Sequence, residues 1–338
     1  HFAVAAGDEA VEMARLSADR VDPTRVGVLI GGGIGGIATL ENQCRILHSR
    51  GPSKSSPLMV PMMIIDIASG VVSMRHGFKG PNVSVVTACA SGSHAIGEAY
   101  WMVRRGDADV MVTGGVEAPV CKLGLTGFCS MRALTERNDD PRRASRPFDA
   151  ERDGFVPAEG GGILVLEEWE HARARGAEPL AEFVGYGLTG DAHHITAPDP
   201  DGEGAQRAIR HALERAEMTP AEVDYVNAHG TSTPLNDKIE TLALKKALGE
   251  HAYRVAISST KSMTGHALGA AGGLECVACV ESFQTGSVPG TMNYENPDPD
   301  CDLDYVPNEA RDLEVRVAMN INLGFGGHNA VLLFRKWD

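Results

Sequence analysis

The same local pattern occurs twice in this chain: an apolar strand runs into a turn and then into a helix of small residues. The first copy covers residues 83–97 and the second covers residues 257–273. From about residue 181, apolar runs of strand length alternate with stretches of helical spacing, which is typical of a mostly parallel sheet with helices on its faces. The pattern therefore predicts an α/β fold with two duplicated halves, which we divide into residues 1–178 and 179–338.

Apolar periodicity also places the individual elements. Residues 61–74 are dense in Met and Ile and predict a buried helix or an oligomer face, whereas residues 51–59 and 135–152 indicate solvated loops. Helices are expected over residues 2–17, 93–105, 203–216, 235–248 and 269–284. Strands are expected over residues 26–30, 85–88, 108–115, 160–167, 183–188, 223–228, 255–259, 315–321 and 330–334.

Composition limits the partners and the compartment. The formal net charge is −14, from 31 Lys and Arg against 45 Asp and Glu, so neither nucleic acid nor an anionic membrane is an expected partner. No apolar run approaches the roughly 20 residues of a membrane span, and no signal peptide is visible. Seven scattered cysteines do not resemble a disulfide framework, so we expect a reducing, cytoplasmic location. Because the chain opens on His1, organellar import stays open.

Cys89 lies where the first repeated strand meets its helix, within residues 87–92 (TACASG). At a helix N-terminus, unpaired backbone N–H groups and the helix dipole favour a thiolate over a thiol. A lone cysteine is nevertheless more often a small core residue. Its assignment as a nucleophile depends on partners elsewhere in the chain.

Two histidines supply such partners, because each follows a strand of the second half. His229 lies in residues 226–234 (VNAHGTSTP), and His266 lies in residues 258–272 (SSTKSMTGHALGAAG). Either histidine alone is more often a hydrogen-bonded structural residue. A cysteine and two histidines at three strand ends, however, are expected to converge at one edge of a sheet.

Two other motifs carry weaker signals. Residues 31–36 (GGGIGG) follow a strand and satisfy G-x-G-x-x-G, which leaves an NAD(P)-dependent oxidoreductase as a remote alternative. The motif lacks the βαβ frame with an acidic residue at a second strand end. Cys276 and Cys279 form a CxxC within an apolar helical run, which indicates core packing rather than a zinc or redox site.

Several motifs together resemble the β-ketoacyl-[acyl-carrier-protein] synthases, specifically the elongating type II enzymes of the thiolase superfamily. The motifs follow the family's order over essentially the whole chain, and the Cys-His-His set separates elongating from initiating synthases, which have Cys-His-Asn. They comprise residues 87–92, 145–149, 152–155, 227–234, 261–266 and 324–327. The resemblance implies a thiolase-like, five-layered αβαβα fold with mixed sheets.

The resemblance also implies a reaction. This is the decarboxylative Claisen condensation of an acyl-cysteine with malonyl-[acyl-carrier protein], which gives 3-oxoacyl-[acyl-carrier protein] and carbon dioxide in fatty-acid elongation. Cys89 would carry the acyl group, and His229 and His266 would stabilise the enolate. Backbone N–H groups of Cys89 and Phe325 would form the oxyanion hole, and Phe325, flanked by glycines, would act as a gate.

The remaining roles implied by the family are supporting ones. The resemblance implies that no metal or redox cofactor is required; phosphopantetheine arrives on the carrier-protein substrate. The family is also expected to form a homodimer. Met59 would reach the acyl pocket across the dimer interface. The implied residues are Lys261 and Glu275 for site support, Thr231 and Thr233 for phosphopantetheine, Ile34 and Met59 for the acyl pocket, and Lys54 and Arg132 for docking an acidic carrier protein.

Two alternatives share this fold. A polyketide ketosynthase would use the same residues, whereas a non-catalytic chain-length partner subunit would normally lack the cysteine that this chain has at position 89. The family also begins with a strand and a helix ahead of what is His1 here. We therefore expect the sheet of the first half to have one strand fewer than that of the second, with an open edge.

Overall fold

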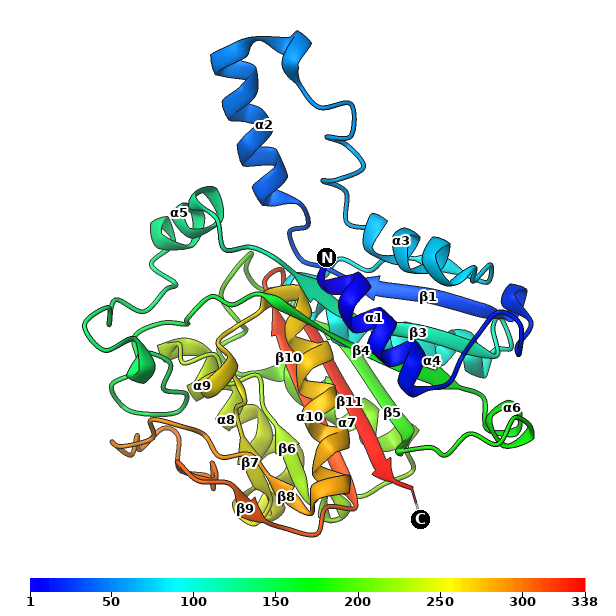
Figure 1. Ribbon diagram of the computed structural model, residues 1–338. Coiled ribbons are helices and arrows are strands. Elements are labelled where there is room, and N and C mark those ends of the chain that lie inside the picture. Colours follow the sequence, from blue (N-terminus) through cyan, green and yellow to red (C-terminus); the bar gives the residue numbers. More distant parts are fainter. Residues whose placement is uncertain (338) are drawn as a thin grey trace.

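The apolar runs predicted as strands form two main β-sheets in the computed structural model, which describes residues 1–337 (Figure 1). The first sheet has the order β2-β1-β3-β4, in which β1 is parallel to β2 and β3, and β3 is antiparallel to β4. Its strands are β1 (Val26–Gly31), β2 (Asn82–Val83), β3 (Val110–Glu117) and β4 (Gly160–Glu167).

The second sheet has the order β5-β11-β10-β6-β7. Strand β6 is parallel to β7 and β10, whereas β11 is antiparallel to β10 and β5. This mixed arrangement corrects the expected mostly parallel sheet, because the short turn between β10 and β11 can join only antiparallel strands. The strands are β5 (Ala181–Gly190), β6 (Tyr225–Asn227), β7 (Ala256–Ser258), β10 (Val317–Gly324) and β11 (His328–Lys336). A separate antiparallel pair joins β8 (Ser287–Val288) to β9 (Arg311–Asp312).

Helices α4 (Ser91–Arg104) and α10 (Ala271–Thr285) lie between the two sheets and contact both of them. Glycines permit this close approach: a Cβ added to Gly162 on β4 would lie 2.2 Å from the carbonyl carbon of Gly273 on α10. The outer layers are α1 (Phe2–Met13) and α3 (Ile67–His76) on the first sheet and α7 (Glu203–Arg215) and α8 (Pro234–Leu248) on the second. The predicted five-layered αβαβα fold is therefore confirmed.

The outer helices α1, α7 and α8 keep to the predicted ranges within about four residues, whereas α3 begins later than expected. Helix α2 was not predicted, because only one of its residues is buried and its sequence therefore has little apolar periodicity. The short helices α5, α6 and α9 were not predicted either. The helices other than α4 and α10 are α1 (Phe2–Met13), α2 (Ile37–Arg50), α3 (Ile67–His76), α5 (Lys122–Ser130), α6 (Trp169–Ala174), α7 (Glu203–Arg215), α8 (Pro234–Leu248) and α9 (Lys261–Thr264).

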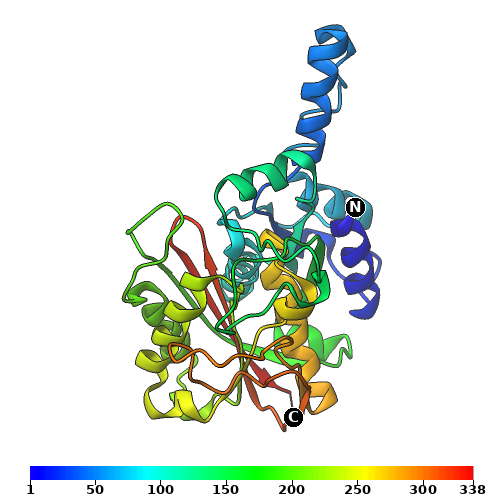
Figure 2. The ribbon, with the colours of Figure 1, turned by 90° about the vertical axis from the view of Figure 1, so that its left-hand side faces the viewer.

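An arm formed by α2 and residues 51–66 projects from the body of the molecule (Figures 1 and 2). Residues 61–66, expected to be buried or to form an oligomer face, are turns in this arm, and the helix begins only at Ile67. Large apolar side chains of the arm are exposed. They are Leu47, Leu58, Val60, Met62 and Ile64, with 40–58% of their surface accessible.

The two ends of the first sheet differ from the predicted pattern. The strand expected over residues 85–88 does not form: β2 ends at Val83, and residues 84–87 belong to no strand, although the carbonyl of Val85 accepts the N–H of Gly32 at 3.3 Å. Strand β4 pairs only with β3 in the described chain, so this sheet has four strands where the second has five. Among residues 1–337, no helix combines the length and the apolar character needed to cross a bilayer.

Candidate active site

Cys89 lies in a strained turn directly ahead of α4. The turn is the 3-10 helix Ala88–Ala90, and Ala88 has φ +52°, a left-handed conformation that costs a non-glycine residue of the order of 1 kcal/mol. Ser91 supports the turn, because its hydroxyl accepts the N–H of Thr87 at 2.9 Å and donates to the carbonyl of Ala88 at 2.7 Å. The thiol of Cys89 is consequently held at a fixed position, only 6% exposed.

Burial dominates the acidity of this thiol. Desolvation raises the pKa of Cys89 to about 12, while the charge of Lys261 and the backbone N–H groups of Phe325 and Cys89 itself act in the opposite direction. The expectation that the helix N-terminus yields a resting thiolate is therefore wrong, because the loss of hydration outweighs the dipole. The two N–H groups beside the sulfur are nevertheless those predicted for the oxyanion hole.

The turn that joins β10 to β11 places Phe325 beside the nucleophile. Gly324 packs so closely that an added Cβ would lie 2.6 Å from the carbonyl oxygen of Thr87 and 3.4 Å from the nitrogen of Cys89. The next glycines, Gly326 and Gly327, have φ +88° and +74°, which glycine adopts at little cost. Phe325 is therefore half-buried on a turn that only glycines allow to bend this tightly.

His229 and His266 face each other with ring centroids 5.3 Å apart and planes at 87°. Both are buried, and the ring of Phe155 links them to the nucleophile, since it packs against Cys89 and lies edge-on to His266 at 5.2 Å. The structure thus brings together the cysteine and the two histidines that the sequence placed at separate strand ends.

The hydrogen-bond partners of His229 assign its tautomer. Its Nδ1 lies 3.3 Å from Nζ of Lys261 and 3.3 Å from Nδ2 of Asn322. Both neighbours are donors, so Nδ1 accepts and the ring hydrogen belongs on Nε2. Nδ1 of His266, by contrast, is buried with no hydrogen-bond partner in residues 1–337.

Both imidazoles are neutral at physiological pH. Desolvation holds the pKa of His229 and of His266 well below the ordinary 6.5, and the nearby charge of Lys261 lowers both further. A neutral imidazole is one N–H donor and one acceptor, with no charge to repel a cation or attract bulk water. The pair is therefore suited to donate hydrogen bonds to an oxygen on which negative charge develops.

Lys261 is held by a carboxylate that is itself fully hydrogen-bonded. One oxygen of Glu275 pairs with Nζ of Lys261, and the other accepts from Asn320 at 2.9 Å and from Asn322 at 2.8 Å. Burial raises the pKa of Glu275, and Lys261 and both amides oppose that shift. Sequence reasoning missed the two asparagines, although polar residues at alternate positions of the apolar strand 317–323 (VAMNINL) are a signal of a buried polar network.

A second carboxylate fixes the backbone of the histidine loop. Glu240, on α8, accepts the N–H of His229 at 2.6 Å and that of Gly230 at 2.8 Å. Burial raises the pKa of Glu240 to about 7, while these two hydrogen bonds favour its ionised form. Sequence reasoning missed this residue too, because helical spacing does not show which residues a buried acid contacts.

The threonines predicted to bind phosphopantetheine lie on the same loop. The hydroxyls of Thr231 and Thr233 are 2.9 Å apart, immediately before α8. Arg152, from one of the quoted motifs, donates to the carbonyls of Thr233 and Pro234 at 3.2 Å and pairs with Asp298 at 2.6 Å. That motif therefore supports the threonine loop.

The glycine turn at residues 31–36 is not a dinucleotide site. Its N–H groups at Gly33, Ile34 and Gly35 all point to the carboxylate of Glu117, at 2.6–3.2 Å. A pyrophosphate would have to displace this buried carboxylate, so the oxidoreductase alternative is contradicted. Ile34 instead packs against the cluster that contains Cys89, as the acyl-pocket assignment requires.

The remaining predicted residues lie away from Cys89 in this chain. Met59 is in the projecting arm, and Lys54 is exposed on the short 3-10 helix Pro52–Lys54 of the same arm. Arg132 is exposed after α5, which contacts α2 at the base of the arm. An apolar hollow of about 580 Å³ opens at this base, and Met59 is not in its lining. It is lined by Ile34, Ile37, Leu40, Met63, Ile64, Ile65, Asp66, Ser84 and Val86.

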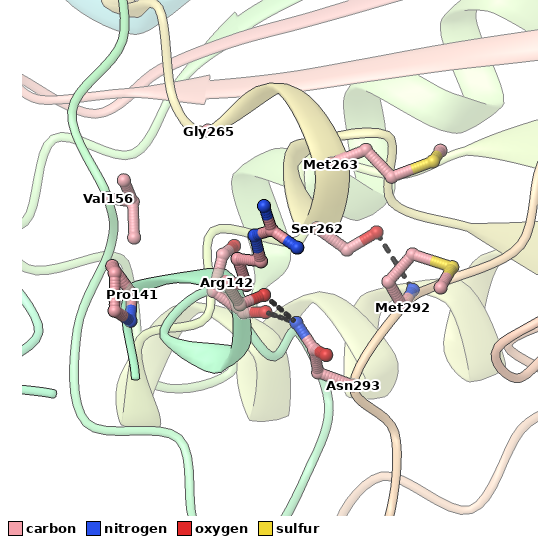
Figure 3. Close-up of a pocket in the computed structure, with 9 residues that line it drawn as sticks. Pro141, Arg142, Val156, Ser262, Met263, Gly265, Met292 and Asn293 are labelled. Atoms are coloured by element: carbon pink, nitrogen blue, oxygen red, sulfur yellow. Dashed lines mark hydrogen bonds between the residues drawn. The ribbon is translucent and has the colours of Figure 1, made fainter. Parts of the chain in front are cut away.

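A second hollow, of about 350 Å³, lies on the outer side of α9 and contains none of the predicted residues (Figure 3). Asn293 lines this hollow, and its side-chain amide donates to the carbonyls of Arg142 and Ser145 at 3.1 and 2.8 Å. Ser262 accepts the N–H of Met292 at 2.9 Å. These contacts fasten the loop over residues 141–145 to the helix that carries Lys261, which is a structural role.

Comparisons with known proteins agree with this arrangement. The family description "Beta-ketoacyl synthase, N-terminal domain" matches residues 1–172, and "Beta-ketoacyl synthase, C-terminal domain" matches residues 180–295. A Synechocystis protein named 3-oxoacyl-[acyl-carrier-protein] synthase 2 is 56% identical over all of this chain and 81% of its own length. A Staphylococcus aureus protein of the same name is 52% identical, again over 100% of this chain and 81% of its own length.

Solved structures show the same fold. A type II polyketide ketosynthase, bound to its acyl-carrier protein and a hexaketide, has a TM-score of 0.96 at 39% identity and covers 100% of this chain and 84% of its own. A β-ketoacyl synthase from Burkholderia phymatum has a TM-score of 0.92 at 37% identity and covers 99% of this chain and 81% of its own.

The acidity of Cys89 gives a testable prediction. Alkylation of Cys89 by iodoacetamide, followed by peptide mass spectrometry, should accelerate about tenfold per pH unit from about pH 7 to about pH 9.5 without levelling off, because the thiolate fraction keeps rising below a pKa of about 12. Exposed Cys44 and Cys129 are alkylated in the same samples and serve as internal controls for reagent and digestion. A plateau for Cys89 near pH 7 would contradict the account.

Proposed function

The chain belongs to the β-ketoacyl synthase family, and on this premise we propose which residues carry out each step of its reaction. The protein is an acyltransferase: it condenses an acyl group held on its own cysteine with malonyl-[acyl-carrier protein], giving 3-oxoacyl-[acyl-carrier protein] and carbon dioxide in fatty-acid chain elongation. The observation that supports the assignment of roles best is the pair of neutral, buried histidines gathered around a buried cysteine.

The first step is acyl transfer to Cys89. The sulfur attacks the thioester carbon of an acyl-carrier protein, and the thiol proton passes to the departing phosphopantetheine thiol, so the step needs no net proton. The N–H groups of Cys89 and Phe325, which lie beside the sulfur, stabilise the oxyanion of the tetrahedral intermediate. Because the resting thiol is protonated, its ionisation occurs during the attack rather than before it.

The second step makes the carbon nucleophile. Malonyl-carrier protein loses carbon dioxide, and the electron pair of the broken bond passes to the thioester oxygen as an enolate. His229, through Nε2–H, and His266 donate hydrogen bonds to that oxygen. The enolate carbon then attacks the acyl-cysteine, the 3-oxoacyl product leaves, and the Cys89 thiolate takes up one proton.

Other residues support Cys89 and the two histidines. Lys261, held by Glu275, fixes the acceptor nitrogen of His229 and lowers the pKa of both histidines. The hydroxyls of Thr231 and Thr233 hydrogen-bond the phosphopantetheine arm. The half-buried ring of Phe325 is the gate, since the flanking glycines free the turn to move.

The partner is an acyl carrier protein, which brings phosphopantetheine with it, and the proposed steps use neither a metal nor a redox cofactor. Lys54 in the arm and Arg132 after α5 are exposed cations, and we propose each as a docking contact for an acidic carrier on a chain of net charge −14. Seven free cysteines fit a reducing compartment, for which we propose the cytoplasm. We propose residues 1–178 and 179–338 as the two duplicated halves of the chain.

The surface at the base of the arm fits a second copy of the chain. Both residues of edge strand β2 are exposed, and Val83 and Val86 add apolar surface of 42% and 53% exposure beside the apolar arm. An exposed edge strand with exposed apolar side chains beside it calls for a covering surface. In a homodimer built on this face, Met59 of one copy would line the acyl pocket that Ile34 borders in the other.

The proposed mechanism predicts a separation of the two steps. Incubation with an acyl-carrier protein should add one acyl mass to Cys89 by intact-protein and peptide mass spectrometry, and Cys89→Ala should abolish the adduct. His229→Ala and His266→Ala should retain acyl transfer but lose condensation by about 100-fold or more, because each removes a donor to the enolate. A label on another residue, or full condensation by either histidine variant, would refute the assigned roles.

If the chain forms the proposed homodimer, a charge introduced into the interface should weaken the association of the two copies. By light scattering the protein should have twice the mass of one chain, and Val86→Asp should raise the dimer dissociation constant by about 30-fold or more. Tyr253→Asp, at a residue 51% exposed on the second half, is the matched control and should leave the mass unchanged. A monomeric wild-type chain would overturn this interface.

A further inference from the structure

His94 is a buried titratable residue with no role in the proposed reaction. It lies in the first turns of α4, just beyond the Cys89 turn, and is only 5% exposed. Desolvation lowers the pKa of His94 to about 4, so its ring is neutral throughout the physiological range. A neutral imidazole in a fixed position can link two elements without changing its hydrogen bonds with pH.

One side of the ring contacts the nucleophile turn. Nδ1 of His94 lies 2.7 Å from the hydroxyl of Thr87, the residue that precedes the 3-10 helix carrying Cys89. The backbone of Thr87 is part of the same turn, because its N–H donates to Ser91 and its carbonyl accepts the N–H of Ala90 at 3.1 Å. A shift of the Thr87 side chain would therefore be transmitted to the backbone beside Cys89.

The other side of the ring contacts the base of the Phe325 hairpin. The ring of His94 lies edge-on to the ring of His328, with centroids 6.4 Å apart, and the backbone of the neighbouring Asn329 favours the protonated form of His94. Since Nδ1 faces Thr87, Nε2 is the ring nitrogen left to face the hairpin. Asn329 is paired with Leu323 across the β10–β11 ladder, next to the pair of Gly324 with His328.

His94 thus joins the two elements that supply the N–H groups beside the sulfur of Cys89. We propose that His94 is a positioning residue that holds the oxyanion hole together by tying the nucleophile turn, through Thr87, to the base of the Phe325 hairpin. This inference rests on the proposed function, which assigns those N–H groups to acyl transfer. The tip of the hairpin, with two glycines at positive φ, stays free to move while its base is fixed.

The proposed role of His94 can be distinguished from ordinary core packing, because the two predict different effects on acyl transfer and on decarboxylation. Acyl transfer needs the N–H groups of both elements at one oxyanion, whereas decarboxylation of malonyl-carrier protein depends on His229 and His266 in the second half. Loss of the bridge should therefore slow the first reaction selectively. A merely structural role for His94 would lower both rates together, in step with thermal stability.

The test compares Thr87→Val, which has nearly the same shape but no hydroxyl, with Thr87→Ser, which keeps the hydroxyl. Single-turnover acylation of Cys89 by an acyl-carrier protein and decarboxylation of malonyl-carrier protein are measured for each. Thr87→Val should slow acylation about 10- to 100-fold, since a misplaced oxyanion donor costs up to about 1,000-fold, and should change decarboxylation less than about threefold. Thr87→Ser should acylate within about threefold of the unmodified protein.

His94→Asn tests the other half of the bridge, because its shorter amide can still hydrogen-bond Thr87 but cannot reach the base of the hairpin. It should show the same selective loss of acylation, with the melting temperature recorded for every variant. Unchanged acylation in Thr87→Val and His94→Asn would overturn the proposal, as would equal losses of both rates. If the unmodified protein neither acylates Cys89 nor decarboxylates malonyl-carrier protein, the proposed function itself fails.

Discussion

The buried ion pair of Lys261 with Glu275 is the interaction on which the rest of the site depends. Taking these two charges out of water costs several kcal/mol for each ion, and that cost is offset only where every donor and acceptor is satisfied. The amides of Asn320 and Asn322 complete the shell around the carboxylate. The result is a cation fixed beside His229, which lowers the pKa of both histidines further than burial alone does and holds Nδ1 of His229 as the acceptor.

Two further carboxylates act on the backbone rather than on side chains. Glu240 binds the N–H groups of the His229 loop, and Glu117 binds the turn that contains Ile34 together with the N–H of Gly269 at 3.1 Å. Glu117 therefore joins the first half to the second, directly behind Cys89. Cys89 comes from one half and the two histidines from the other, and the Glu117 contact joins these halves.

Much of this arrangement was predictable from sequence. Apolar periodicity gave the order of strands and helices, and motifs at strand ends located Cys89, His229 and His266, which the fold brings together. The contacts of Asn320 and Glu240 were not predictable, because they depend on which residues meet across the sheets. The acidity of Cys89 was predicted with the wrong sign, since a dipole is visible in sequence but the extent of desolvation is not. The pocket role of Met59 stays a prediction. The arm that carries Met59 projects from the body of the chain, and Met59 does not line the hollow beside Ile34.

The central claim is that His229 is a neutral imidazole with its hydrogen on Nε2. Nitrogen NMR of protein labelled in its histidine rings tests this most directly, with His229→Ala used to assign the resonance. The account predicts one protonated and one unprotonated ring nitrogen for His229, unchanged from about pH 8 down to about pH 6, where an ordinary histidine becomes charged. A doubly protonated ring in that range, or a hydrogen on Nδ1, would contradict it.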